Sequence, residues 1–246
     1  MSLCDYLLRL GDNALILSER LGEWCGHGPV LEEDIALTNV ALDLLGQARM
    51  WLGYAGELAG RDEDQLAFLR DAGEFRNVLL VEQPNGDFAH TMVRQFFFDA
   101  WHLLLLEKLS DSTDQRIRGI AAKALKEVTY HLRRSADWVV RLGDGTGESH
   151  SRMQHAVADL WIYTGELFEM DALENEMQQS GAGCDLAALH APWSSEIARV
   201  FAEATLEIPG QTWMQHGGKR GVHSEKFGYI LAEMQFLQRA YPGAKW

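Results

Sequence analysis

The sequence predicts an all-α fold, a four-helix bundle with additional C-terminal helices, and three observations lead to this prediction. Apolar residues recur at helical spacing along most of the 246 residues, whereas no stretch shows the alternation of a half-buried strand. The chain has only five prolines, so long stretches are free of helix breakers. Hydrophobic residues make up 47% of the chain, enough for a sizeable core.

Four long helices are expected at about 6–25, 32–58, 89–109 and 112–142. In the first, residues 11–13 (Gly-Asp-Asn) are a candidate step, a point at which the helix would be interrupted. The second opens on three carboxylates, which suit the positive end of a helix dipole. The third holds Phe96, Phe97 and Phe98 and is apolar on nearly every side, so it should be the most buried. The fourth opens on a capping box, with Ser112 as the cap and Gln115 three residues later.

Shorter helices should follow the bundle. A second capping box at Ser151 and Gln154 predicts a helix that runs through Phe168 towards Met177. Further helices are expected near 194–206, after Pro192, and at 224–240, with one short helix earlier at about 64–69. We therefore expect one domain over 1–246, with the core bundle at about 6–142 and the additional helices at about 151–241.

Charge and cysteine usage exclude several classes of function. The net charge of −14 disfavours binding to nucleic acid or to an anionic membrane surface. The three cysteines are far apart and build neither a disulfide framework nor a metal site. With no signal peptide and no apolar run of about 20 residues, a cytoplasmic protein is expected.

A helical bundle of this size can hold a carboxylate-bridged di-metal site, which requires two Glu-x-x-His pairs and two further carboxylates. The chain has no Glu-x-x-His. The nearest patterns are Asp99 with His102 and Glu127 with His131. Asp99, inside an apolar helix, should be paired or protonated, and His131 and Arg134 are its candidate partners. Residues Asn39, Asp43 and Gln47 form a polar line on the second helix, for which we favour a buried hydrogen-bonded cluster over a solvated stripe or a metal centre.

Four segments carry a resemblance to a known family. Residues 34–49 (DIALTNVALDLLGQAR), 17–24 (LSERLGEW), 126–131 (KEVTYH) and 213–229 are similar to the C subunits of phenylacetyl-CoA epoxidases, and the similarity extends along the whole chain. The resemblance implies a ferritin-like fold related to the di-iron catalytic A subunit of the same complexes.

The resemblance also implies that the di-iron site is degenerate. Aligned with the catalytic pattern, three ligand positions keep a suitable side chain and three do not. Those kept are Glu19, Asp99 and His131, and those replaced are Leu44, Gln47 and Val128. No catalytic residue, bound metal or cofactor is then expected in this chain.

A structural role follows from the resemblance. It implies a non-catalytic partner that binds the A subunit, as a heterotetramer of two A and two C, in the complex that epoxidises the ring of phenylacetyl-CoA with O2. Other components of the complex, including the reductase, would be further partners. Parts of the second and third helices are the expected contact surface, by analogy with related oxygenases.

Two alternatives remain open. The chain could be an active di-iron oxygenase with a non-standard ligand set, using Glu19, Asp99, His102, Glu127 and His131. It could also bind a CoA ester through Lys219 and Arg220, although the negative charge and the lack of a phosphate-binding glycine loop oppose this. A flexible connector is the favoured interpretation of the 217–221 stretch.

Overall fold

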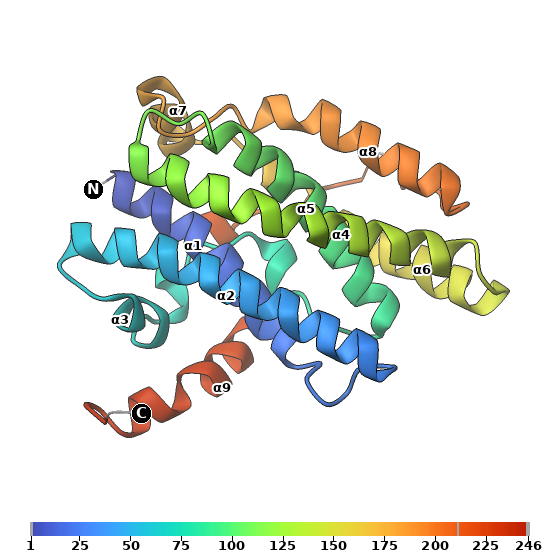
Figure 1. Cartoon of the computed structure of the whole chain (residues 1–246), viewed down its shortest axis with the longest axis horizontal. Helices are drawn as coiled ribbons and strands as arrows, with labels where there is room; N and C mark the ends of the chain where they lie inside the picture. The colour runs from blue at the N-terminus through green and yellow to red at the C-terminus, as the bar shows by residue number, and fades with distance from the viewer. Residues whose placement is uncertain (1, 211, 245–246) are drawn as a thin grey trace. The chain divides into compact units, whose positions relative to one another are not determined.

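The computed structural model describes residues 2–210 and 212–244, and over these residues it is helical without a strand, as predicted (Figure 1). The chain divides into two compact units. The first comprises Met1–Pro84 with Gly217–Trp246, and the second comprises Asn85–His216. Met1, Gln211, Lys245 and Trp246, which the predicted domain includes, lie outside the described residues.

The first unit is built on a pair of long helices, α1 (Ser2–Gly22) and α2 (Leu31–Ala59), that pack along each other. Helix α1 is continuous, so the candidate step at residues 11–13 is wrong. Asn13 is buried there, and its Oδ1 accepts a 2.8 Å hydrogen bond from the Val78 amide. Gly11 allows α2 to approach closely, because a Cβ at this position would lie 2.7 Å from Leu52 Cδ2.

A buried ion pair fixes the chain that follows α3 (Glu63–Phe68) against α1. Both Asp12 carboxylate oxygens face the Arg70 guanidinium, with Oδ2 3.0 Å from Nη1. The same Oδ2 accepts a 2.8 Å hydrogen bond from the Arg76 amide. The Arg70 guanidinium also lies 4.2 Å from the centre of the Phe75 ring. Asp12 is therefore a structural residue of α1 rather than a break in it.

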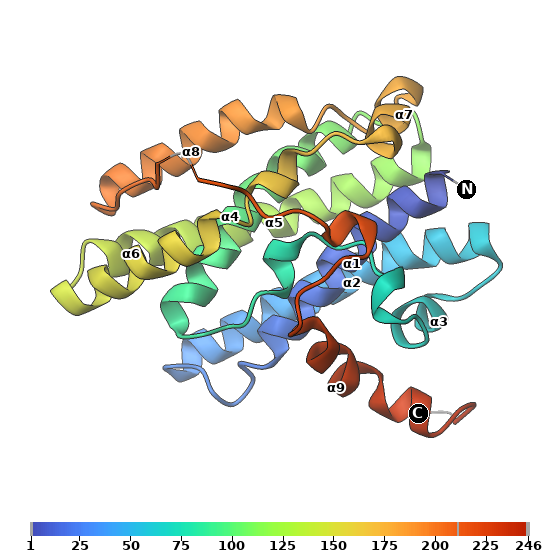
Figure 2. The same cartoon turned by 180° about the vertical axis from the view of Figure 1, so that it is seen from behind.

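The C-terminal segment belongs to the first unit through a second buried polar cluster. Glu82 ends the 3₁₀ turn η2 (Leu79–Glu82), and its Oε2 lies 2.7 Å from His223 Nδ1 and 3.0 Å from Asn77 Nδ2. Its Oε1 accepts a 2.6 Å hydrogen bond from the Ser224 amide. The predicted last helix is confirmed as α9 (Phe227–Ala240), which packs on α3 (Figure 2).

The 217–221 stretch is packed rather than a flexible connector, so that interpretation is wrong. It contains the 3₁₀ turn η5 (Gly218–Arg220), and Lys219 is buried. Gly218 lies so close to the Asn77 carbonyl that a side chain would collide with it. Glycine at this position therefore permits backbone packing.

The second unit is built on α4 (Phe88–Leu109) and α5 (Gln115–Gly143), with α6 (Gly147–Trp161) and α8 (His190–Glu203) packed against them. Helix α4 buries 16 of its 22 residues, which confirms that it is a deeply buried helix. A cluster of aromatic rings joins α4, α6 and α8, and Trp193 Nε1 donates a 3.0 Å hydrogen bond to the Phe97 carbonyl.

Both predicted capping boxes are wrong. Asp114 caps α5, accepting hydrogen bonds from the Arg116 and Ile117 amides at 2.8 and 2.9 Å, while Ser112 Oγ donates to the Ala182 carbonyl at 2.9 Å. Thr146, rather than Ser151, caps α6. In the loop before α5 a neighbouring residue satisfies the first amides, whereas α6 begins at Gly147 and Ser151 lies inside it.

The helix predicted from Ser151 towards Met177 is also shorter than expected. It ends at Trp161, and the 3₁₀ turn η3 (Gly165–Phe168) and helix α7 (Ala172–Ser180) follow it. Helix α8 begins at His190, so Pro192 lies in its first turn, where a missing N–H costs little. Within 2–210 and 212–244, no helix combines the length and apolarity needed to cross a membrane.

Candidate functional site

The six predicted ligand positions fall on the two long helix pairs. Glu19 lies on α1 and is half-buried, whereas Leu44 and Gln47 on α2 are fully buried. In the second unit, Asp99 lies on α4, Val128 and His131 lie on α5, and all three are buried. That these are former metal-ligand positions stays a prediction.

The polar line on α2 is not a single buried cluster, so that prediction is wrong for two of its three residues. Gln47 is fully buried, but Asn39 is exposed and Asp43 is half-buried. The neighbouring Leu42 and Leu45 are exposed as well. Helix α2 thus carries apolar side chains on an outward face in addition to its core face.

Glu19 is the one acidic ligand candidate in the first unit. Burial raises the pKa of its carboxyl group, and the nearby negative charge of Glu23 raises it further. A carboxyl group in this setting holds its proton to a higher pH than an exposed glutamate.

Asp99 is held in the second unit by two hydrogen bonds that sequence reasoning missed. Gln95 Nε2 donates to Asp99 Oδ1 at 2.9 Å, and Ser135 Oγ donates to Oδ2 at 2.8 Å. His131 and Arg134, the expected partners, act on Asp99 through their charge. For Gln95 the signal was present in the spacing, because Gln95 precedes Asp99 by one turn on the same helix.

Burial dominates the proton affinity of Asp99. It raises the pKa of this carboxyl group to about 6, against the charge of His131 and the hydrogen bonds from Ser135 and Gln95, which lower it. Asp99 therefore changes its protonation state near neutral pH. Such a group can form a hydrogen bond in either state, which fits a structural polar core.

The side chain of His102 is a neutral aromatic ring packed in the core. Burial, and then the charge of His131, lowers the pKa of its imidazole to about 3. Its ring centre lies 5.0 Å from that of Phe98, and its Nδ1 has no hydrogen-bond partner among the described residues. Although i,i+3 spacing places His102 one turn from Asp99, its surroundings are those of a packed aromatic ring.

The donor atoms proposed for the alternative oxygenase do not converge within the second unit. Among its described residues, no three of Asp99, His102, Glu127 and His131 bring donor atoms within 4.8 Å of one another. The i,i+3 and i,i+4 spacings seen in the sequence therefore do not assemble a ligand group on α4 and α5.

Comparison with known proteins assigns the chain to a protein family. The whole chain, residues 1–246, matches the family described as phenylacetic acid catabolic protein. The chain belongs to this family. The phenylacetic acid catabolic protein family is ferritin-like, in agreement with the predicted fold.

The chain is also similar to a subunit of an oxidoreductase complex. The chain is 53% identical over 245 residues to the C subunit of the 1,2-phenylacetyl-CoA epoxidase of Escherichia coli (strain K12), covering 99% of each chain. The resemblance expected from residues 34–49 and the three other segments is thereby confirmed.

Proposed function

We propose that this chain is the C subunit of a phenylacetyl-CoA epoxidase, a non-catalytic partner that binds and stabilises the di-iron catalytic A subunit in phenylacetate catabolism. The observation that carries the proposal is the 53% identity to the E. coli C subunit over 99% of both chains.

The chemistry of the six positions supports a non-catalytic role. Leu44 and Val128 are hydrocarbon side chains, and a neutral amide such as Gln47 is a poor iron ligand. The residues therefore do not fit a di-iron centre with six protein ligands. In the second unit, Asp99 uses both carboxylate oxygens to accept hydrogen bonds within the protein.

A surface suited to a partner lies on α2. Four large apolar side chains are exposed there at spacings of four, seven and three residues, which place them along one helical stripe: Leu31, Ile35, Leu42 and Leu45. Exposed apolar stripes of this kind mark protein interfaces. Helix α4 contributes less surface because most of it is buried, so of the two helices expected at the interface α2 is the stronger candidate.

Co-expression with the catalytic A subunit tests the proposed assembly. We expect the two chains to co-purify and to give, by native mass spectrometry, the mass of two A and two C subunits. The reductase and the other components should bind this assembly. A chain that stays monomeric beside the A subunit at micromolar concentration contradicts the proposal.

The non-catalytic role needs a separate measurement. In the reconstituted complex, Asp99→Asn and His131→Gln should leave the rate of phenylacetyl-CoA epoxidation within about twofold of wild type, because neither residue touches substrate in this proposal. The purified chain should also contain no stoichiometric iron. Loss of the rate in a complex that still assembles, or about two irons per chain, supports the oxygenase alternative instead.

A further inference from the structure

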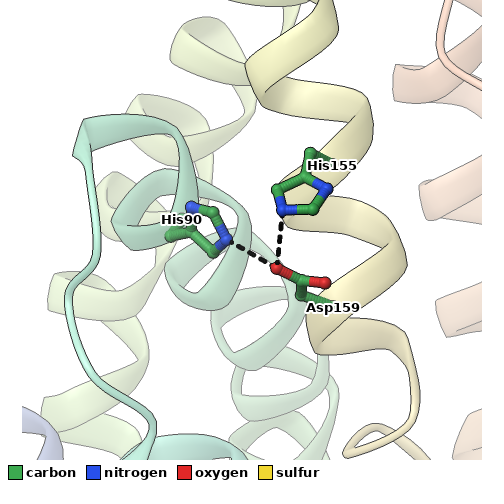
Figure 3. A group of neighbouring side chains, drawn as sticks. All are labelled: His90, His155 and Asp159. Atoms are coloured by element: carbon green, nitrogen blue, oxygen red, sulfur yellow. Dashed lines mark hydrogen bonds and ion pairs between the residues drawn. The ribbon is translucent and has the colours of Figure 1, made fainter.

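We propose that His90, His155 and Asp159 form a binding site for a divalent transition-metal ion of the zinc class, independent of the degenerate positions. His90 lies in the first turn of α4, and His155 and Asp159 lie one turn apart on α6. One donor atom from each residue falls within 4.8 Å of the other two (Figure 3). All three residues belong to the second unit.

Both imidazoles face the same carboxylate oxygen. Asp159 Oδ2 lies 3.1 Å from His90 Nε2 and 3.3 Å from His155 Nε2, and Figure 3 shows the three side chains converging from the two helices. Replacing these contacts with bonds of about 2.0–2.2 Å to a central ion requires only small side-chain movements. The i,i+4 spacing of His155 and Asp159 holds two ligands on one face of α6.

Asp87 orients His90 as an outer carboxylate does at a metal site. As the cap of α4, Asp87 accepts a 3.0 Å hydrogen bond from the His90 amide through Oδ1, and the same oxygen lies 2.9 Å from His90 Nδ1. A proton on Nδ1 leaves the Nε2 lone pair of a neutral His90 directed at Asp159. Two lone pairs facing each other require a cation between them, and a metal ion or a second proton on the ring meets that need.

The surrounding charges permit a dication. Arg152 is the nearby cation, and its Nη1 lies 3.6 Å from Asp87 Oδ2 while its Nη2 lies 2.6 Å from Glu148 Oε1. These two carboxylates offset its charge, so the Asp159 carboxylate is left to face the incoming ion. Because Arg152 pairs with the second carboxylate oxygen of Asp87, Asp87 remains the residue that orients His90.

The types of ligand in the site determine which class of ion it can bind, and the exposure of two of the ligands lets an ion reach it from solvent. Two imidazoles and one carboxylate suit zinc and its neighbours, whereas magnesium and calcium prefer oxygen ligands alone. The side chains of His155 and Asp159 are 71% and 49% exposed, so an ion can reach the site from solvent. Three protein ligands leave a fourth tetrahedral position for water. A bound ion would join the start of α4 to α6.

Zinc titration of the full chain, without a polyhistidine tag and after treatment with EDTA, tests the site. We expect one saturable Zn²⁺ site per chain by calorimetry, and no matching site for Mg²⁺. His155→Ala and Asp159→Asn should each weaken zinc binding about tenfold or more, and Asp87→Asn should weaken it by a similar factor through His90. The matched controls His27→Ala and Asp137→Asn change an exposed histidine of the first unit and an exposed carboxylate of α5, and should leave the dissociation constant unchanged.

Two further measurements keep the test independent of folding. Circular dichroism should show the same helix content in every variant, because His155 and Asp159 are largely exposed. At a hundredfold excess of Zn²⁺ over its dissociation constant, the wild-type Tm should rise on the order of 5 °C, and this rise should disappear in His155→Ala. No saturable zinc binding, or binding that survives both His155→Ala and Asp159→Asn unchanged, overturns the proposal.

Discussion

Ser135 Oγ donates a 2.8 Å hydrogen bond to Asp99 Oδ2, joining α5 to the buried carboxylate of α4. The same hydroxyl lies 3.2 Å from the Leu132 carbonyl, so it has a second acceptor available. Because a hydroxyl both donates and accepts, Ser135 can serve Asp99 in either protonation state. This property determines how the polar core should respond to pH and to substitution.

Asp99→Asn should flatten the pH dependence of stability. The folded-state pKa of Asp99 is raised from 3.8 to about 6, so its stabilising contribution is complete below pH 3.8 and is lost as pH rises through 6. The loss by pH 7 amounts to about 3 kcal/mol in the free energy of unfolding. Asn mimics the protonated acid, and its amide can donate to Ser135 while the hydroxyl turns to Leu132. Urea unfolding between pH 4 and pH 7.5 measures the difference.

An exposed aspartate provides the control for that series. Asp137→Asn changes an exposed carboxyl group on α5, two residues after Ser135, and should leave the pH profile of wild type intact. If Asp99→Asn and wild type lose stability in parallel as pH rises, Asp99 does not titrate in the folded protein near pH 6.

Ser135→Ala should have the opposite effect on Asp99. Removing the hydroxyl deprives the charged carboxylate of one donor, so its folded-state pKa should rise further and the free energy of unfolding at pH 7 should fall by ~1–3 kcal/mol. A cycle of Asp99→Ala, Ser135→Ala and the double variant measures the coupling between the two residues, because alanine at position 99 cannot hydrogen-bond Ser135. Additive losses would mean that the hydrogen bond contributes nothing to stability.

Periodicity predicted the helices well because each helix is specified by its own residues. Helices α2 and α4 begin and end within a residue or two of the expected positions, since carboxylates, Gly60 and the Asn-Gly turn mark their ends. The cap of α5 was mispredicted because its loop holds several residues able to cap, and that of α6 because the helix begins at Gly147, before Ser151. Ser112 is engaged by the distant Ala182 carbonyl, a tertiary contact that no local pattern contains.

The side-chain partners were harder to predict, because they depend on how far one helix is shifted along another. His131 and Ser135 share a face of α5, one turn apart, and the axial position of α4 decides how Asp99 meets that face. The convergence of His90 with His155 likewise depends on the packing of α4 against α6. For this cluster, the i,i+4 spacing of His155 and Asp159 was the one signal available in the sequence.

Asp12→Ala should unfold the first unit at lower denaturant concentration. Asp12 and Arg70 are almost fully buried, and removal of the carboxylate leaves the guanidinium without its charged partner. Loss of one member of a buried ion pair costs about 3–5 kcal/mol. The matched variant Asp71→Ala removes an exposed carboxylate paired with Arg239, and should change the free energy of unfolding by less than about 1 kcal/mol. Equal effects of the two variants would contradict the structural role of Asp12.

The outward face of α2 gives a test that separates partner binding from folding. Leu42 is 59% exposed, whereas Leu44, two residues later on the same helix, is fully buried. Leu42→Glu should therefore leave the free energy of unfolding within about 0.5 kcal/mol of wild type. In the proposed assembly, it should weaken association with the catalytic A subunit by about tenfold or more, because a carboxylate would be buried against an apolar partner surface.

Leu44→Ala should show the reverse pattern, and the contrast between the two leucines decides what α2 does. Truncation of this buried side chain should cost ~2–5 kcal/mol of stability through the lost burial and the cavity left behind. At a temperature where the variant is still folded, its affinity for the A subunit should match that of wild type, because Leu44 has no exposed surface. Calorimetric titration of the A subunit with both variants, alongside urea unfolding of each, measures the two effects. If Leu42→Glu binds the A subunit as wild type does, the apolar stripe of α2 is not the docking surface and the interface lies on another face of the chain.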